Sequence, residues 1–123
     1  MLKSTAAFAT LALLAGSPAF AREAPAGVKV TAEGFNDAKD MPLYTYASDT
    51  TPNKSTCYGQ CATAWPPLAA SATDKDAGDW TVVTRDDGSK QWAYKGTPLY
   101  TFFRDTAGQP ATGVSAAWPR AKQ

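Results

Sequence analysis

Two cysteines carry the most reactive side chains of this sequence, which contains no histidine. Cys57 and Cys61 lie four residues apart, so one helical turn would bring their Cα atoms within the span of a disulfide. In an oxidising compartment the pair is predicted to form a disulfide that fixes the surrounding loop and needs no cofactor. The alternative is a thiol-redox or copper-handling pair, in which Cys57, Cys61 and Met41 would bind Cu(I), because soft sulfur ligands select that ion.

Two aspartates are the second candidates for chemistry. Asp49 and Asp105 stand in matching segments, and a threonine follows each of them. Paired carboxylates are the machinery of many glycosidases, so a carboxylate-based hydrolase is one hypothesis. That chemistry requires different pKa values for the acid and the base, whereas matching segments predict matching surroundings. We therefore expect each carboxylate to accept N–H groups two residues further on, in an Asx turn. Without histidine no nucleophile–histidine pair can form, and no catalytic residue is predicted.

The two aspartates belong to an internal repeat. Met41–Thr50 recurs as Thr97–Thr106 with six of ten residues identical, and an Ala-Trp-Pro segment follows each copy. Strand alternation places Leu43 and Leu99 on one face and the tyrosines on the other. The tyrosine face is expected to pack against the Trp-Pro segments; as an exposed surface it would instead stack on a sugar or peptide. The residues that recur are Tyr44, Tyr46, Asp49 and Trp65 in the first copy and Tyr100, Phe102, Asp105 and Trp118 in the second.

Local chemistry predicts mostly strands and turns. β-Branched and aromatic residues favour strands at 28–31, 80–84, 90–94 and 98–103. Asp86–Ser89 predicts a turn, because its glycine accepts the positive φ of a tight turn, and it joins the second and third strands as a hairpin. The segment 55–64 is predicted to be helical, with Ser55 or Thr56 as its cap and Pro66 as its end.

These elements predict an all-β or mainly β fold. A single small domain at 28–119 would consist of two pseudo-symmetric strand-turn-strand repeats, with one short helical turn near the cysteines. The first repeat would cover about 28–68 and the second about 80–119. A chain of about 100 residues can bury one core, and large aromatic side chains would carry much of that burial.

Residues 1–21 have the three parts of a secretory signal peptide: Lys3, a short apolar run and the cleavage site Ala19–Ala21. Residues 22–27 would follow as a flexible leader. No cysteine stands at the cleavage point and no second apolar segment follows, so we expect neither a lipid anchor nor a membrane span in the mature chain. Without Lys3 the basic and acidic residues are equal at 11 each, which predicts no attraction to nucleic acid. The protein is predicted to act in the periplasm or outside the cell.

A family resemblance rests on the repeated motif and on the segment between its copies. The residues that carry it are Tyr44, Tyr46, Asp49, Tyr100, Phe102 and Asp105, with Cys57, Cys61 and Trp65–Leu68. In these residues the chain resembles a bacterial family of secreted repeats of unknown function, described as predicted lipoproteins with a Yx(FWY)xxD motif. The similarity extends from about Val28 to Pro119. The resemblance implies no established activity, and the absence of a lipoprotein cysteine keeps the family's lipid anchor from being carried over.

Three functions are compatible with these observations. The leading hypothesis is an exported β-rich repeat module that binds or scaffolds, with Cys57 and Cys61 oxidised to each other. The second is thiol redox or copper handling through the same two cysteines. The third is hydrolysis by Asp49 and Asp105. The sequence identifies neither a ligand nor a partner.

Overall fold

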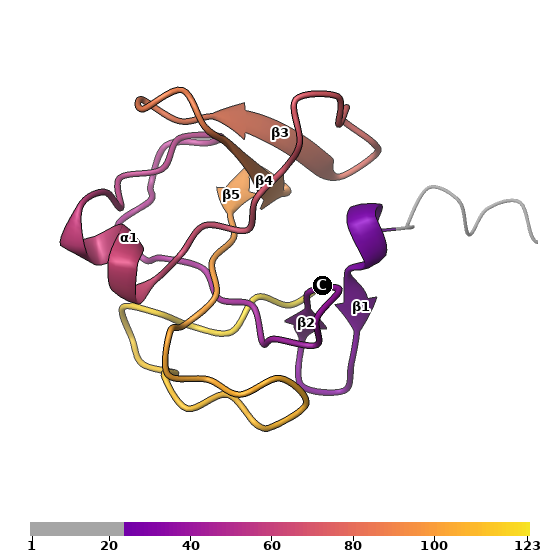
Figure 1. Cartoon of the computed structure of the whole chain (residues 1–123), viewed down its shortest axis with the longest axis vertical. Coiled ribbons are helices and arrows are strands. Elements are labelled where there is room, and N and C mark those ends of the chain that lie inside the picture. Colours follow the sequence, from indigo (N-terminus) through magenta and orange to yellow (C-terminus); the bar gives the residue numbers. More distant parts are fainter. Residues whose placement is uncertain (1–23) are drawn as a thin grey trace, which may run out of the picture.

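The computed structural model describes residues 24–123, so the predicted signal peptide at 1–21 lies outside the described residues. These residues form a mainly β domain with two small antiparallel sheets and little helix (Figure 1). The described end of the predicted leader forms a 3-10 turn at Pro25–Gly27, and Ala24 packs against the core. Within this part of the chain, no helix is long and apolar enough to cross a membrane.

Each repeat begins with a β-hairpin. The strands are β1 (Lys29–Val30) paired with β2 (Phe35–Asn36), and β3 (Trp80–Thr84) paired with β4 (Lys90–Tyr94), beside which β5 (Thr97–Pro98) adds a third strand. The second hairpin has the predicted bounds. In the first hairpin, β1 covers only two residues of the predicted strand at 28–31, because the chain turns back directly after Val30.

Local hydrogen bonds explain both turns. In the first hairpin, the Thr31 hydroxyl donates to the Gly34 carbonyl at 2.7 Å, which closes the turn early. In the second, the Arg85 N–H donates to the Ser89 carbonyl at 2.8 Å, and the Ser89 N–H donates to Asp87 Oδ1 at 2.9 Å. Gly88 adopts a φ of 90° there, a conformation in which a side chain would be strained.

The predicted strand at 98–103 is wrong beyond its first residue. Only Thr97–Pro98 joins the sheet, and Tyr100 instead forms isolated bridges to Tyr44 and Pro67. The chain leaves β4 at this point and crosses to the other repeat. Its hydrogen bonds therefore continue with different partners, and no uninterrupted strand forms.

The predicted short helical turn near the cysteines is confirmed as α1, which covers Gln60–Ala64 within the predicted segment 55–64. Neither Ser55 nor Thr56 caps it, since both side chains are taken up by tertiary hydrogen bonds. Gly59 stands at the N-cap with a φ of 61° and makes no side-chain cap. The helix ends just before the Trp-Pro segment, as predicted from the proline.

The two repeats pair with each other at their motif tyrosines. Tyr44 and Tyr100 exchange backbone hydrogen bonds in both directions, with N···O distances of 2.8 and 2.9 Å. Arg120 forms a bridge to Tyr44, and Pro67 forms a bridge to Tyr100. Exchanging the repeats maps this arrangement onto itself, so a pseudo-two-fold axis passes between the two tyrosines.

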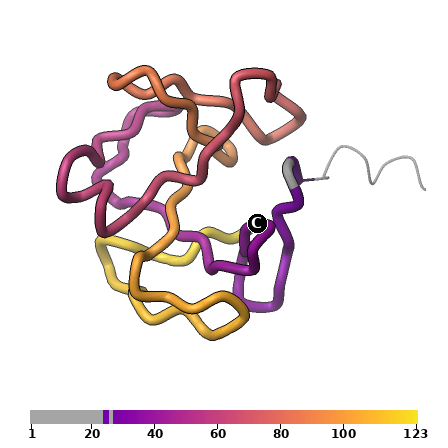
Figure 2. Tube along the Cα trace, in the orientation of Figure 1, coloured from indigo at the N-terminus to yellow at the C-terminus, as the bar shows by residue number. Residues whose placement is uncertain are grey.

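Each repeat closes the hairpin of the other. The C-terminal residues return beside β2 (Figure 2), where the Phe35 N–H donates to the Ala121 carbonyl at 2.9 Å. At the equivalent place in the second hairpin, the Trp92 N–H donates to the Leu68 carbonyl, also at 2.9 Å. The two repeats therefore interlock, and neither completes its own sheet alone.

Buried side chains form two separate clusters, and strand alternation assigns the motif residues to them as predicted. The hairpin cluster consists of Phe35, Leu43, Trp80, Trp92, Leu99 and Ala121. The motif cluster consists of Tyr44, Cys57, Tyr100 and Trp118, with Tyr46, Cys61, Ala62, Trp65, Phe102 and Ala111 packed on it. The leucines of the repeated segment thus lie in one cluster and its first tyrosines in the other.

Candidate functional site

Four aromatic rings of the motif cluster form one continuous stack. Tyr46 lies on Trp118 with ring centroids 4.1 Å apart, and Trp118 lies on Trp65 at 4.0 Å. Phe102 continues the stack on the far side of Trp65 at 4.2 Å. The two indoles are within 2° of parallel, and Trp118 is only 8% exposed. The tyrosine face therefore packs against the Trp-Pro segments instead of forming an open stacking surface.

Each of the two fully buried motif tyrosines, Tyr44 and Tyr100, donates a hydrogen bond from its hydroxyl to the aspartate of the other repeat. Tyr44 Oη lies 2.6 Å from Asp105 Oδ2, and Tyr100 Oη lies 2.5 Å from Asp49 Oδ2. Hydrogen bonds to a carboxylate are shorter and stronger than those between neutral groups. Two such bonds, crossed about the pseudo-two-fold axis, fasten the repeats together.

The second oxygen of each aspartate closes a loop within its own repeat. Asp49 Oδ1 accepts the Thr56 backbone N–H at 2.8 Å and its hydroxyl at 2.7 Å. Asp105 Oδ1 accepts the same two groups of Thr112 at 2.8 and 2.6 Å. The expected Asx turn is therefore wrong, because the bonded residue lies seven positions further on and not two. Both carboxylates therefore accept the same set of donors, a tyrosine hydroxyl of the other repeat and two groups of a threonine of their own repeat.

Thr56 and Thr112 complete these two sites and are not among the residues that the sequence motif predicts. Each threonine lies seven residues after the aspartate of its own repeat, so an alignment of the two repeats that is extended past the motif superposes Thr56 and Thr112. This equal separation in the sequence is the one signal that could have identified them. A repeated hydroxyl at a fixed distance from a repeated carboxylate predicts a hydrogen bond.

A glycine marks where the second-repeat loop lies against the stack. A Cβ at Gly113 would come within 2.7 Å of the Phe102 ring and 2.8 Å of the Trp65 ring, so only glycine fits. The Gly113 N–H donates to Tyr44 Oη at 3.0 Å. The corresponding position in the first repeat is Cys57. The first-repeat loop therefore has a cysteine at the position where the second-repeat loop has a glycine.

A buried arginine supports the first-repeat loop. Arg85 is 3% exposed and lies over the Tyr58 ring at 4.4 Å. Its guanidinium donates to Ser55 Oγ at 2.8 Å, Gln91 Oε1 at 2.7 Å and the Cys57 carbonyl at 2.5 Å. Ser55 Oγ is in turn 2.7 Å from Tyr100 Oη, which links the guanidinium to the tyrosine–aspartate pair. The second repeat has Ala111 in the place of Ser55 and no such link.

Cys57 and Cys61 form the predicted disulfide, with their Cα atoms 5.3 Å apart. Cys57 is fully buried in the motif cluster. Closing so short a loop stabilises the fold by roughly 2 kcal/mol. The oxidised sulfurs are not thiolates, so a Cu(I) site formed with Met41 stays a prediction for the reduced protein. Among residues 24–123, no group of three or more Cys, Asp or Glu side chains is placed to hold a metal ion.

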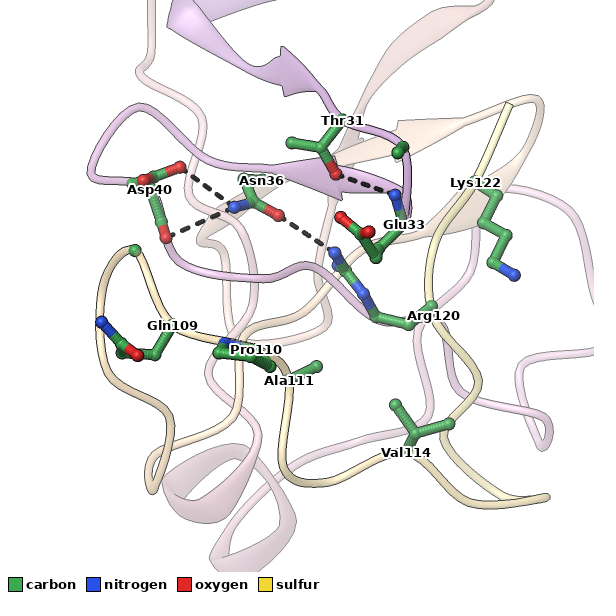
Figure 3. A pocket seen from close by; sticks show the side chains of 12 residues that line it. Thr31, Glu33, Asn36, Asp40, Gln109, Pro110, Ala111, Val114, Arg120 and Lys122 are labelled. Carbon is green, nitrogen blue, oxygen red and sulfur yellow. Dashed lines mark hydrogen bonds between the residues drawn. The ribbon is translucent and has the colours of Figure 1, made fainter.

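An open cavity of about 900 Å³ lies between the first hairpin and the second-repeat loop (Figure 3). Arg120 lies on the wall of this cavity, and three acceptors bind its guanidinium. Nothing in the sequence motif indicated that this residue would belong to a site. Its guanidinium donates to the Phe35 carbonyl at 2.8 Å, the Leu43 carbonyl at 3.0 Å and Asn36 Oδ1 at 3.1 Å. Burial lowers the pKa of Arg120, because desolvation disfavours its charge. The cation is thus fixed in position and partly stripped of water.

The stability of the fold is expected to fall above pH 10, as the buried tyrosines ionise. Burial raises the pKa of Tyr44 to about 12, and the hydrogen bond to Asp105 adds to the effect. Burial also raises the pKa of Tyr100, with Asp49 adding to it. Because both folded-state pKa values exceed the unfolded value of about 10, the neutral hydroxyls contribute stability that is complete below pH 10. The contribution of Tyr44 is lost as the pH rises through about 12, and that of Tyr100 is lost at a higher pH.

Denaturant unfolding at a series of alkaline pH values measures this loss. The variant Tyr44→Phe/Tyr100→Phe cannot ionise at these positions, so its stability should depend less on pH over the same range. Equal pH dependence in the two proteins would show that other groups cause the alkaline loss.

Comparison with known proteins relates this architecture to one family. The model of a family described as a secreted repeat of unknown function matches the chain twice, at residues 29–69 and 81–122. The matched segments are the two interlocked repeats of the structure. Searches among curated proteins and among solved structures each found no match. The family and the disulfide agree with the predicted export of the protein. The chain belongs to the family of secreted repeats of unknown function.

Proposed function

We propose that this exported module is a binding protein and that its ligand occupies the open cavity beside Arg120 (Figure 3). The observation that carries the proposal is that this guanidinium is fixed in position and partly desolvated. Its position is fixed by three acceptors, and no carboxylate of residues 24–123 forms an ion pair with it. A guanidinium has five N–H donors, and these acceptors take three of them, so two remain that can donate to a carboxylate. A fixed, partly desolvated guanidinium facing a cavity therefore favours a ligand carboxylate.

The other lining residues favour a short peptide or a free amino acid. Lys122 adds a second cation beside Arg120, while Glu33 and Asp40 offer carboxylates to an ammonium group. Pro110 and Val114 supply an apolar wall for a side chain. A wall with both charges would repel a polyanion and accept a zwitterion. The volume of about 900 Å³ falls within the range of small-molecule sites, roughly 300–1,000 Å³.

Calorimetric titration with a panel of dipeptides with free termini, Ala-Leu first, tests the proposal. We expect binding that weakens about tenfold or more when the peptide carboxylate is converted to an amide, a loss of about 1.4 kcal/mol. The variant Val114→Asp should weaken binding similarly, because it places a charge on the apolar wall.

Val30→Asp is the matched control. Val30 is 53% exposed, nearly the same as Val114 at 55%, and it does not line the cavity. It should bind the dipeptides like the unmodified protein. The proposal is wrong if no dipeptide in the panel binds, if the amides bind as well as the acids, or if both valine variants behave alike.

A further inference from the structure

The motif cluster places two buried tyrosines in contact with a pair of stacked indoles. The Trp65 and Trp118 rings are parallel at 4.0 Å. Tyr44 meets Trp65 edge-on at 5.0 Å, and Tyr100 meets Trp118 edge-on at 5.2 Å. Tryptophan and tyrosine are the most easily oxidised aromatic side chains, and an electron moves readily between rings in contact. Trp65 is partly exposed, so the pair is within reach of an oxidant in solution.

Each buried tyrosine also has a proton acceptor in place. Removing an electron from a phenol makes its proton strongly acidic, so oxidation is easy only where a base can take the proton at once. Asp105 Oδ2 lies 2.6 Å from Tyr44 Oη, and Asp49 Oδ2 lies 2.5 Å from Tyr100 Oη. The pKa of Tyr44 is raised to about 12 by burial, so its hydroxyl keeps the proton at neutral pH until an electron leaves.

We propose that the motif cluster is a sink for one-electron oxidants, in which the indole pair receives the oxidising equivalent and a buried tyrosine holds it as a neutral radical. The oxidant is a small radical of the nitrogen dioxide or peroxyl class. This activity goes beyond ligand binding and uses none of the cavity residues.

The electrons and protons balance in two steps. First, the oxidant takes one electron from the indole pair, which becomes a radical cation while the oxidant is reduced to its anion. Tyr44 or Tyr100 then passes one electron to the indoles and its hydroxyl proton to Asp105 or Asp49. The products are a neutral tyrosyl radical, a protonated aspartate and the restored indoles. No bond between heavy atoms forms or breaks, so reduction by an external thiol or phenol returns the starting state.

Burial distinguishes this site from surface tyrosines. Tyr44 and Tyr100 are both 0% exposed. A radical on either ring is therefore shielded from coupling with another protein molecule. Asp105 is only 9% exposed, so at Tyr44 the proton stays on the adjacent carboxylate instead of escaping to water, which makes that oxidation reversible.

Flash photolysis of the full mature protein with a tris(bipyridine)ruthenium photosensitiser and a sacrificial electron acceptor tests the proposal. The photogenerated ruthenium(III) complex is the one-electron oxidant, and transient absorption and electron paramagnetic resonance distinguish tryptophan from tyrosine radicals. We expect a tryptophan radical that converts into a long-lived tyrosyl radical, more slowly in deuterated water because a proton moves in that step.

The variant Tyr44→Phe/Tyr100→Phe keeps both rings but loses both hydroxyls. It should give a several-fold lower yield of tyrosyl radical and a longer-lived tryptophan radical. Tyr94→Phe is the control, since Tyr94 packs on Trp80 and Phe35 in the other cluster, and it should leave the yield unchanged. The proposal is overturned if the double variant gives the same tyrosyl yield, or if the unmodified protein shows only a tryptophan radical.

Asp49→Asn/Asp105→Asn separates proton transfer from ring contact. The amides keep the shape of the carboxylates but are much weaker bases. If this variant folds, its tyrosyl radical should form more slowly than in the unmodified protein, and an unchanged rate would contradict the role of the carboxylates. If it does not fold, the phenylalanine variant still decides the question.

Discussion

Replacing Trp118 with alanine is expected to lower the free energy of unfolding by about 3–5 kcal/mol, the usual cost of deleting a large aromatic side chain from a core. The indole is 8% exposed and stacks between Tyr46 and Trp65. It also meets Tyr100 edge-on at 5.2 Å. Its removal breaks the stack at its centre and opens a cavity between the repeats. In a domain of this size the melting temperature should fall by more than about 10 °C, which thermal circular dichroism measures.

Phe103→Ala is the control for this prediction. Phe103 adjoins the end of the same stack, edge-on to Phe102 at 5.4 Å, but is 55% exposed. Its removal should change the stability by no more than about 0.5 kcal/mol. If both substitutions have the same small effect, the stacked rings do not form a core.

Replacing Asp105 with alanine is expected to cost about 2–3 kcal/mol. The buried Tyr44 hydroxyl then loses its acceptor, which costs about 1–3 kcal/mol, whereas water can partly replace the acceptor for the two donors of the exposed Thr112. The donors are the Tyr44 hydroxyl and the backbone N–H and hydroxyl of Thr112. Asp49 has the same three kinds of donor but is more exposed. Water can replace part of its bonding, so Asp49→Ala should cost less. Urea unfolding compares the two variants.

A double-mutant cycle tests whether the cross-repeat bond itself carries this cost. Tyr44→Phe removes the donor from one side and Asp105→Ala removes the acceptor from the other. We expect an interaction energy of about 1–3 kcal/mol between them, typical of residues in one hydrogen-bond network. Additive effects would mean that Asp105 acts only through Thr112.

Elements whose partners lie near in the chain could be predicted from the sequence. The second hairpin has the predicted bounds, because β-branched and aromatic residues flank a turn that contains Gly88. The Cys57–Cys61 disulfide follows from a separation of four residues and an oxidising compartment. In both cases the deciding contacts span only a few residues.

Predictions that depended on distant partners were less accurate. The segment at 98–103 has strand-forming residues, but its partner changes after β5 and the strand stops. Ser55 and Thr56 are good capping residues, but in the folded protein their side chains form hydrogen bonds with Tyr100 and Asp49 instead of with the helix. Local propensity is worth fractions of a kcal/mol per residue, and a buried tertiary hydrogen bond outweighs it.

The sequence by itself determined that the protein is exported and that it contains two copies of one β-rich unit, because these properties follow from local composition and from repetition. It also determined that the motif tyrosines and leucines face different clusters, because side chains alternate along a strand. Only the tertiary structure decided that each tyrosine bonds to the aspartate of the opposite copy, that Arg85 supports one loop and that Arg120 faces a cavity. Identical motifs are compatible with bonding inside a copy or across copies. The antiparallel pairing of Tyr44 with Tyr100 makes the choice, because it sets each copy against the loop of the other.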